Sequence, residues 1–427
     1  MPTTEDHPQR YALVNELHAR PFPSLEAPCH AVFVAFKEPV DAASRDRARD
    51  MAHLAELVHR HGAPEPQSDA THYSAQIGRH LLKWESHTEF VTYSAFSPGV
   101  VDRPFDPARA EVFPAAWQDR APGKRLCAVL VQVELMPEHR GSISQKLEDW
   151  FVAESLACAD VLDGVAIVAG DFRIDPAGNM RFAVFVEPRT GPRRIGRIVQ
   201  RLCEIETYRA MSMLGLGRAR DLTGRLNRLE VELSDLVGSM SDDARPAEAT
   251  LHELLRISAE LETLAVRFSF RAGATAAYEA IVNDRITVLR EARFLGRQTF
   301  AEFMRRRYDP AMRTVKSAET RLRQMVERAA RAAELLRTRV DVERSAQNQK
   351  LLESMDKRAD LQLRLQATVE GLSVVAISYY AVSLVGYLVY PVAEPLGLTK
   401  GVLTAALTLP VVLLVWLMVR RIRQKVH

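Results

Sequence analysis

The chain has 427 residues, of which 47% are hydrophobic and 26% are charged, so its length allows about three domains with a substantial core and excludes disorder as the main state. Its formal net charge of +3 divides into −8 over residues 1–190, +7 over 191–370 and +4 over 371–427, which indicates that the carboxyl-terminal end faces an anionic partner. The four cysteines lie far apart without a CxxC pair, which excludes a disulfide scaffold and a cysteine-based zinc site.

Residues 1–190 are predicted to form an α/β or α+β cytoplasmic head with a mixed sheet. This region holds 16 of the 22 prolines, and its apolar side chains alternate as they do in half-buried strands. In the segment 126–135, for example, Val129, Val131 and Val133 share one face. Further strands are expected at 30–36, 81–96, 165–174 and 181–186, and helices at 41–61 and 143–159.

Residues 191–370 are predicted to form long helices. Only Pro192, Pro246 and Pro310 occur there, and proline is tolerated in the first turn of a helix but breaks its interior. Leucines in this region recur at heptad spacing, which predicts coiled-coil-like pairing. The turn-forming segment 238–245 should join the first two helices as an antiparallel hairpin. The third helix has no stop signal before the next apolar run, so we expect one rod of about 80 residues.

Two uncharged runs, 371–392 and 401–419, make up the predicted transmembrane region 371–419. Each is long enough to cross a hydrocarbon core about 30 Å thick as a helix, and a core helix of a soluble protein seldom stays uncharged for so long. The tail 420–427 is basic, and the positive-inside rule places it in the cytoplasm. An even number of spans then places the amino terminus there too, with the lipid bilayer as the first partner.

Three strings carry a resemblance to a known family. They are HPQRYALVNELHARP (7–21), LLKWESHTEF (81–90) and LLESMDKRADLQLRLQATVEGLSVVAISYY (351–380). On these strings the chain resembles, over nearly its whole length, an uncharacterised bacterial family of membrane-anchored proteins, the domain of unknown function 3422. The resemblance implies the inner (cytoplasmic) membrane and supplies no activity.

In the order of its predicted elements the chain also looks like the CorA-type divalent cation channels. That similarity implies a pentamer whose first span lines a pore. The Gly-Met-Asn that ends the first span in those channels is absent, and the nearest residues here are Gly386, Tyr387 and Leu388. Magnesium selectivity is therefore not implied, and fold-level similarity alone does not establish function.

A polar face runs along the first predicted span. Its members follow or lie near heptad spacing: Gln366, Ser373, Tyr380, Ser383 and Tyr387. In a ring of identical subunits this face would surround a wettable path. In the other interpretation the hydroxyls pack between helices or lie at the membrane interface, which is favoured because the span itself has no charged or amide side chain.

Two groups in the head are candidates for a binding site. Period-two alternation places Lys83, Glu85, His87 and Glu89 on one side of a strand, where they could hold a cation or exchange a proton. Alternatively they are the solvated face of a sheet with cross-strand ion pairs. No metal follows from the pattern.

The second candidate group in the head lies near the amino terminus and could bind a phosphate or a carboxylate. Its members could also be ordinary surface residues. The group consists of Arg10, Glu16, His18 and Arg20.

A charge contact is expected at the membrane end of the stalk. The predicted turn bears Asp242 and Asp243, and Arg420 and Arg421 open the basic tail. The two groups should meet across subunits, or the tail should bind anionic lipid headgroups instead.

An enzyme is the weaker hypothesis, because the chain has no HExxH, glycine-rich phosphate loop or nucleophile elbow. No cofactor and no nucleic-acid partner is expected. The leading hypothesis is a self-associating, tail-anchored membrane protein of CorA-like build that conducts or senses an ion, with a cation as a further partner. The alternative is a membrane-tethered scaffold or ligand-binding protein whose spans serve only as an anchor.

Overall fold

The computed structural model describes residues 6–16, 21–40, 44–99, 103–240, 246–393 and 399–426. Two compact units divide the chain. The first comprises Met1–Ser241 with His252–Ala332, and the second comprises Asp242–Leu251 with Ala333–His427. The predicted boundaries at 190, 370 and 419 stay a prediction.

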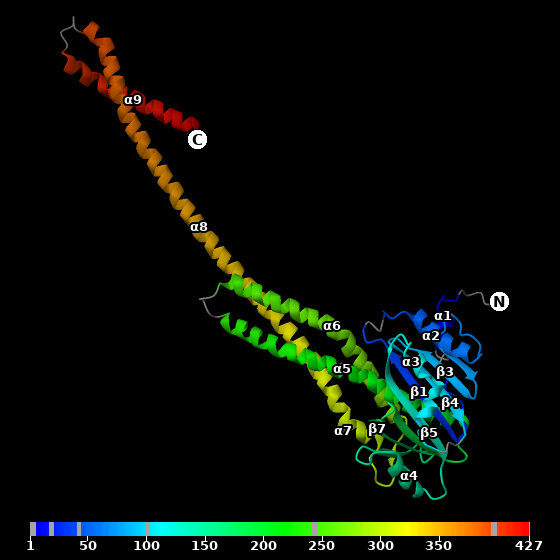
Figure 1. The fold of residues 1–427 in the computed structure, drawn as a ribbon. Helices are drawn as coiled ribbons and strands as arrows, with labels where there is room; N and C mark the ends of the chain where they lie inside the picture. Colours follow the sequence, from blue (N-terminus) through cyan, green and yellow to red (C-terminus); the bar gives the residue numbers. More distant parts are fainter. Residues whose placement is uncertain are drawn as a thin grey trace. The chain divides into compact units, whose positions relative to one another are not determined.

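A nine-stranded mixed sheet forms the head (Figure 1). Its spatial order is β2-β3-β4-β1-β5-β8-β7-β6-β9, with β5 and β8 parallel and the other pairs antiparallel. The strands are β1 (Cys29–Lys37), β2 (His72–Ile77), β3 (His80–Ser86), β4 (Phe90–Pro98), β5 (Lys124–Leu135), β6 (Ala157–Val161), β7 (Ala166–Ile174), β8 (Met180–Val186) and β9 (Ala292–Arg293). The predicted mixed sheet is therefore confirmed.

Both faces of this sheet are covered, so its central strands are apolar on both sides. Along β1, Ala31, Phe33 and Ala35 contribute to one core and Val32 and Val34 to the other. The first core is closed by α5 (Pro192–Ser239), α6 (Ala247–Thr287) and α7 (Phe300–Arg307). The second is closed by α2 (Arg47–Arg60), α3 (Ala115–Gln118) and α4 (Ser142–Trp150). Two short helices, α1 (Arg10–Glu16) and η2 (Pro107–Val112), complete the described head.

Three predicted elements of the head differ from the structure. The run 81–96 is not one strand but the hairpin β3–β4, with its turn at 87–89. The helix predicted at 41–61 begins at Arg47, where the Asp46 side chain caps it. The helix predicted at 143–159 ends at Trp150, and β6 follows it. The β3–β4 turn at 87–89 contains no glycine, proline or asparagine, so the sequence has no turn signal that would predict this hairpin.

The prolines do mark the starts of three long helices, α5 (Pro192–Ser239), α6 (Ala247–Thr287) and α8 (Asp309–Ala393). In the first unit α5 and α6 are antiparallel. The Arg256 guanidinium lies 2.6 Å from the Glu232 carboxylate, and further along the pair the Thr275 hydroxyl lies 3.5 Å from the Ser212 carbonyl oxygen. The leucine stripe of α5 is buried, as its heptad spacing requires.

The helix α8 comprises 85 residues, close to the length of about 80 expected from the sequence, and Ala333–Ala393 belong to the second unit. The helix α9 (Lys400–Val426) follows it. Both carry an apolar window of membrane-spanning length, and only 11% of the α8 window and 6% of the α9 window are buried. The two helices contact each other near Tyr387, whose ring lies 5.5 Å from the Lys400 ammonium.

Candidate functional site

A pocket of about 210 Å³ lies between the sheet and α5. We call it the β3–α5 pocket. The strands β1, β3 and β4 supply one wall, α5 supplies the other, and Arg285 of α6 closes one side. Its lining consists of Phe22, Phe33, Lys83, Glu85, His87, Phe90, Thr92, Ser94, Phe96, Gln200, Cys203, Glu204, Thr207, Tyr208 and Arg285.

A chain of polar contacts crosses the lining of this pocket. Lys83 pairs with Glu85 at 3.1 Å and donates a hydrogen bond of 2.8 Å to the side-chain oxygen of Gln200. The Gln200 amide donates to Glu204 at 2.7 Å, and Arg285 donates to the other oxygen of Glu204 at 2.5 Å. Two acids and two bases thus compensate one another, and the lining has no excess charge from these groups. Such a pocket favours a neutral or zwitterionic ligand over a strongly charged one.

Aromatic rings form the other part of the lining. His87 stacks on Phe90 with ring centroids 4.3 Å apart, and Tyr208 meets Phe90 edge-on at 6.0 Å. Tyr208 also stacks on Tyr278 at 5.6 Å. Rings in these geometries attract one another beyond their area burial and form a rigid apolar wall. The pocket therefore offers apolar contact on one side and hydrogen-bonding groups on the other.

Glu89 lies beside this aromatic wall and is almost fully buried. It forms an ion pair with Arg271, accepts a hydrogen bond of 3.0 Å from the Tyr278 hydroxyl and lies 3.8 Å from the Lys37 ammonium. Burial, then the charge of Glu89, raises the pKa of Tyr278, and burial, then the charge of Arg271, lowers the pKa of Lys37. A buried carboxylate with this many partners fixes the position of the β3–β4 turn.

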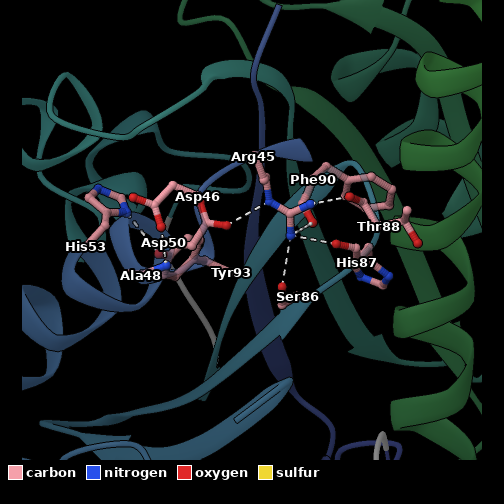
Figure 2. Close-up of polar contacts among 10 residues, drawn as sticks. All are labelled: Arg45, Asp46, Ala48, Asp50, His53, Ser86, His87, Thr88, Phe90 and Tyr93. Atoms are coloured by element: carbon pink, nitrogen blue, oxygen red, sulfur yellow. Dashed lines mark hydrogen bonds and ion pairs between the residues drawn. The ribbon is translucent and has the colours of Figure 1, made fainter. Parts of the chain in front are cut away.

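Arg45 holds the same turn from the α2 side of the sheet (Figure 2). Its guanidinium donates to Asp50 at 2.7 Å, to the Ser86 hydroxyl at 2.9 Å and to the His87 carbonyl at 2.5 Å. It also donates to the carbonyls of Thr88 and Phe90. The five N–H donors of a guanidinium suit a turn that presents several carbonyl oxygens close together. The pocket wall at His87 is therefore fixed from both sides.

No cluster of metal ligands occurs in the part of the chain that the structure describes, because no three His, Cys, Asp or Glu side chains there are placed to hold one ion. The buried His53, for example, forms hydrogen bonds to the Tyr93 hydroxyl at 2.9 Å and the Trp117 carbonyl at 3.0 Å. Its ring nitrogens are both occupied (Figure 2 shows the contact with Tyr93). It is a structural residue of the aromatic core.

The structure gathers part of the first predicted head group in one place. Lys83, Glu85 and His87 line the β3–α5 pocket, while Glu89 lies next to it. The predicted strand does not include all four residues. β3 ends at Ser86, and the next residues of the group, His87 and Glu89, belong to the turn.

The second predicted head group is not assembled by the described residues. Arg10 is exposed on α1 and forms an ion pair with Asp6. The side chain of Glu16 and the whole of His18 and Arg20 lie outside the described residues. That group stays a prediction.

The predicted polar face of the first span is mostly uncovered within the chain. Tyr380 and Tyr387 are about two-thirds exposed, and Ser373 is exposed as well. Gln366 donates to Glu370 at 3.2 Å, and the Ser383 hydroxyl donates to the Tyr379 carbonyl at 3.0 Å.

The predicted charge contact is half outside the described residues, since Asp242 and Asp243 belong to the undescribed part of the chain. On α9 the Arg420 guanidinium lies 5.1 Å from the centre of the Trp416 ring, and Arg421 is exposed. An arginine stacked on tryptophan at the end of an apolar helix is typical of a membrane interface.

Sequence reasoning missed the helical half of the pocket. Gln200, Glu204 and Tyr208 recur every four residues along α5, so they share one face of that helix. Polar side chains at this spacing, next to the buried stripe of Ile198 and Leu202, were the available signal. Lys83, the partner of Gln200 on β3, lies 117 positions earlier, and no local pattern connects the two.

Comparison with known proteins places the chain in one family. A family model described as "Protein of unknown function (DUF3422)" matches residues 5–426. No curated protein and no solved structure matches the chain. The resemblance carried by the three strings is therefore confirmed, while the similarity to CorA-type channels rests on the order of the elements alone.

Proposed function

The chain belongs to the DUF3422 family, and we propose that it is a membrane-anchored protein whose head binds a small amphipathic ligand in the β3–α5 pocket. Anchorage is supported by the two apolar windows of α8 and α9, which are 11% and 6% buried. A core helix of a soluble protein buries such a window, so this surface needs lipid or protein around it. The uncovered apolar helices are the observation that carries anchorage.

The proposed topology keeps both termini in the cytoplasm of a bacterial cell. Arg420 and Arg421 follow the apolar run of α9, and the positive-inside rule assigns that end to the inner side of the membrane. Two spans return the chain to the side from which it entered. The head would then sample cytoplasmic ligands.

The ligand class follows from the two halves of the β3–α5 pocket. The polar half suits the zwitterionic or neutral polar group of a ligand, because its charges compensate one another. It consists of Lys83, Glu85, Gln200, Glu204 and Arg285. The rings of Phe90 and Tyr208 suit an apolar body. Amino acids with large apolar side chains have this chemistry and serve as probes.

This function is tested by thermal unfolding of the full chain in neutral detergent with L-phenylalanine, L-leucine and related zwitterions. Ser94 lines the pocket, so Ser94→Phe fills it, whereas Ser74→Phe places the same ring on exposed β2 as a matched control. We expect at least one probe to raise the unfolding temperature of the wild type and of Ser74→Phe but not of Ser94→Phe. A wild type that no probe stabilises, or an equal response of Ser94→Phe, would contradict the proposal.

A second candidate function is conduction of a cation by a homo-oligomer. It is favoured by the exposure of Ser373, Tyr380 and Tyr387, since a ring of α8 helices could turn this face inward. Self-association, as in a coiled coil, would also cover Leu351 and Met355, which are about 60% exposed on α8.

Liposomes that contain the purified protein distinguish conduction from simple anchorage. For a channel we expect cation flux that Tyr380→Leu or Tyr387→Leu changes, together with several subunits per particle in light scattering. Zero flux with a monomeric particle would leave the spans as an anchor alone.

A further inference from the structure

A second pocket of the head, of about 700 Å³, lies between the start of α5 and the end of α6. We call it the arginine pocket. Its basic members are Arg194, Arg197 and Arg201 of α5 and Arg290, which follows α6. The turn between β6 and β7 supplies the opposite rim with Asp163.

The three arginines of α5 share one face of the helix, because they are spaced by three and four residues. In the part of the chain that the structure describes, no hydrogen bond or ion pair compensates their side chains. Burial, then the nearby charges of Arg197 and Arg285, lowers the pKa of Arg201. The only acid in the lining, Asp163, is already held by Arg290 at 2.6 Å. The pocket therefore has an excess of positive charge.

The start of α5 adds to this excess. Its first turn has no acidic residue, and the capping Gly191 provides no side-chain acceptor. Arg193 and Arg194 occupy this turn instead, where the helix dipole is already positive. Basic side chains in the first turn are unfavourable with respect to the helix dipole, and a bound anion would offset them.

The opposite rim of the arginine pocket is held in place by the end of α6. The Leu162 amide donates to the Leu289 carbonyl at 2.9 Å, which ties the β6–β7 turn to that end. Leu162, Asp163 and Arg290 all have left-handed backbone conformations, with φ of 54°, 61° and 49°. Such conformations are unfavourable for side chains of this size and concentrate where ligands are clamped.

We infer that the arginine pocket binds a phosphate-bearing small molecule. A phosphate carries more than one charge and accepts bidentate hydrogen bonds from several guanidinium groups at once, whereas one carboxylate would leave most of these arginines uncompensated. The volume of about 700 Å³ is within the range of small-molecule sites. The site is separate from the β3–α5 pocket, whose Arg285 is engaged by Glu204.

The test uses inorganic pyrophosphate as the probe and the full chain in neutral detergent, titrated by calorimetry in phosphate-free buffer. Arg194→Glu/Arg197→Glu reverses two exposed lining residues, and Arg220→Glu/Arg228→Glu makes the same charge change at exposed positions of α5 outside the lining. We expect saturable binding that the first double variant weakens at least tenfold and the second changes less than twofold. Thermal unfolding of both variants checks that they are folded.

A second arm identifies the source of the phosphate group. Mixed micelles with phosphatidylglycerol, and with phosphatidylcholine as the control, are added to the same titration. The pocket is assigned to a lipid headgroup if phosphatidylglycerol, but not phosphatidylcholine, displaces pyrophosphate. The same assignment follows if phosphatidylglycerol binds with the same arginine dependence and pyrophosphate does not bind. Binding of pyrophosphate without displacement assigns the pocket to a soluble phosphate ester. If neither probe binds, or if both double variants bind like the wild type, the inference is overturned.

Discussion

Arg45 is the residue on which the β3–β4 turn depends most. Its guanidinium donates to the Asp50 carboxylate, to the Ser86 hydroxyl and to backbone carbonyls of the turn. Burial, opposed by the bond to Arg45, raises the pKa of Asp50. Loss of the guanidinium would leave the buried Asp50 carboxylate without its ion-pair partner and remove the donor that these acceptors share.

Arg45→Ala is therefore expected to lower the free energy of unfolding by about 3–5 kcal/mol. Arg45→Lys should be destabilising as well, because an ammonium cannot reach all of these acceptors. Urea unfolding, followed by the fluorescence of the buried Trp84 and Trp117, measures the effect. Arg47→Ala removes an exposed arginine two positions later and should stay within about 0.5 kcal/mol of the wild type. Equal effects of Arg45→Ala and Arg47→Ala would refute this role.

His30 makes the stability of the head depend on pH. Burial, then the charges of Arg109 and two further basic residues, lowers its pKa from 6.5 to about 4. As the pH falls, His30 is protonated in the unfolded chain before it is protonated in the folded head. Its contribution to the free energy of unfolding is therefore fully present above pH 6.5 and is lost as the pH drops toward 4. Protonation of His30 alone should lower the free energy of unfolding by about 2 kcal/mol between pH 7 and pH 5.

Unfolding at pH 7 and pH 5 of His30→Gln and of His59→Gln checks this assignment. His59 is exposed on α2, and His59→Gln serves as the matched control. His30→Gln should reduce the loss of unfolding free energy between pH 7 and pH 5 by about 2 kcal/mol relative to that control. The slope that remains in His30→Gln comes from groups such as His53, whose pKa is also lowered by burial. A His30→Gln variant with the full wild-type slope would contradict the assignment.

At the scale of elements, the crossing of α5 and α6 depends on a glycine. A Cβ at Gly215 would lie 2.3 Å from the Thr275 hydroxyl, and Thr275 is itself buried. Close approach of two helix backbones is one of the few reasons to place glycine inside a helix, because glycine lowers helix stability relative to alanine.

Gly215→Ala is accordingly expected to lower the free energy of unfolding by about 1–3 kcal/mol, in spite of the better helix propensity of alanine. Gly217→Ala is the matched control, since nothing lies within 4 Å of a Cβ there. It should raise the free energy of unfolding by about 0.5–1 kcal/mol. Opposite signs for the two variants in thermal unfolding confirm the close crossing, and two stabilising variants would contradict it.

The elements also show which parts of the fold a sequence can predict. Pro192, Pro246 and Pro310 located the long helices because proline has a local steric effect. The alternation around Lys83 and Glu85 identified the polar side of β3 for a similarly local reason. Other parts left weaker local signals: the turn after Ser86 has no glycine, and β2, β6 and the two-residue β9 escaped prediction.

Half of the candidate site was beyond prediction because its contacts are between distant segments. Lys83 and Gln200 are 117 positions apart, and Glu204 and Arg285 are 81 apart. From the sequence alone, Gln200 and Glu204 could equally have faced solvent. They line the pocket only because α5 packs onto the sheet. The arginine pocket has the same origin, since α5 and the end of α6 meet only in the folded head.

At the scale of the whole molecule, membrane anchorage requires that lipid surround the apolar windows of α8 and α9. The chain itself buries only 11% and 6% of these windows, so most of their apolar surface is left uncovered. Removing that surface from water is favourable, and it requires an apolar environment outside the chain. A bilayer supplies that environment along the apolar windows of both helices. Self-association alone would cover one face of each helix and leave the other exposed.

Fractionation of cells that make the full chain tests this claim most directly, with a chain ending at Glu370 as the comparison. We expect the full chain to sediment with membranes, to stay there in alkaline carbonate and to be released by detergent, while the shortened chain stays in the supernatant. A full chain that is found in the supernatant without detergent would contradict membrane anchorage and the function proposed from it.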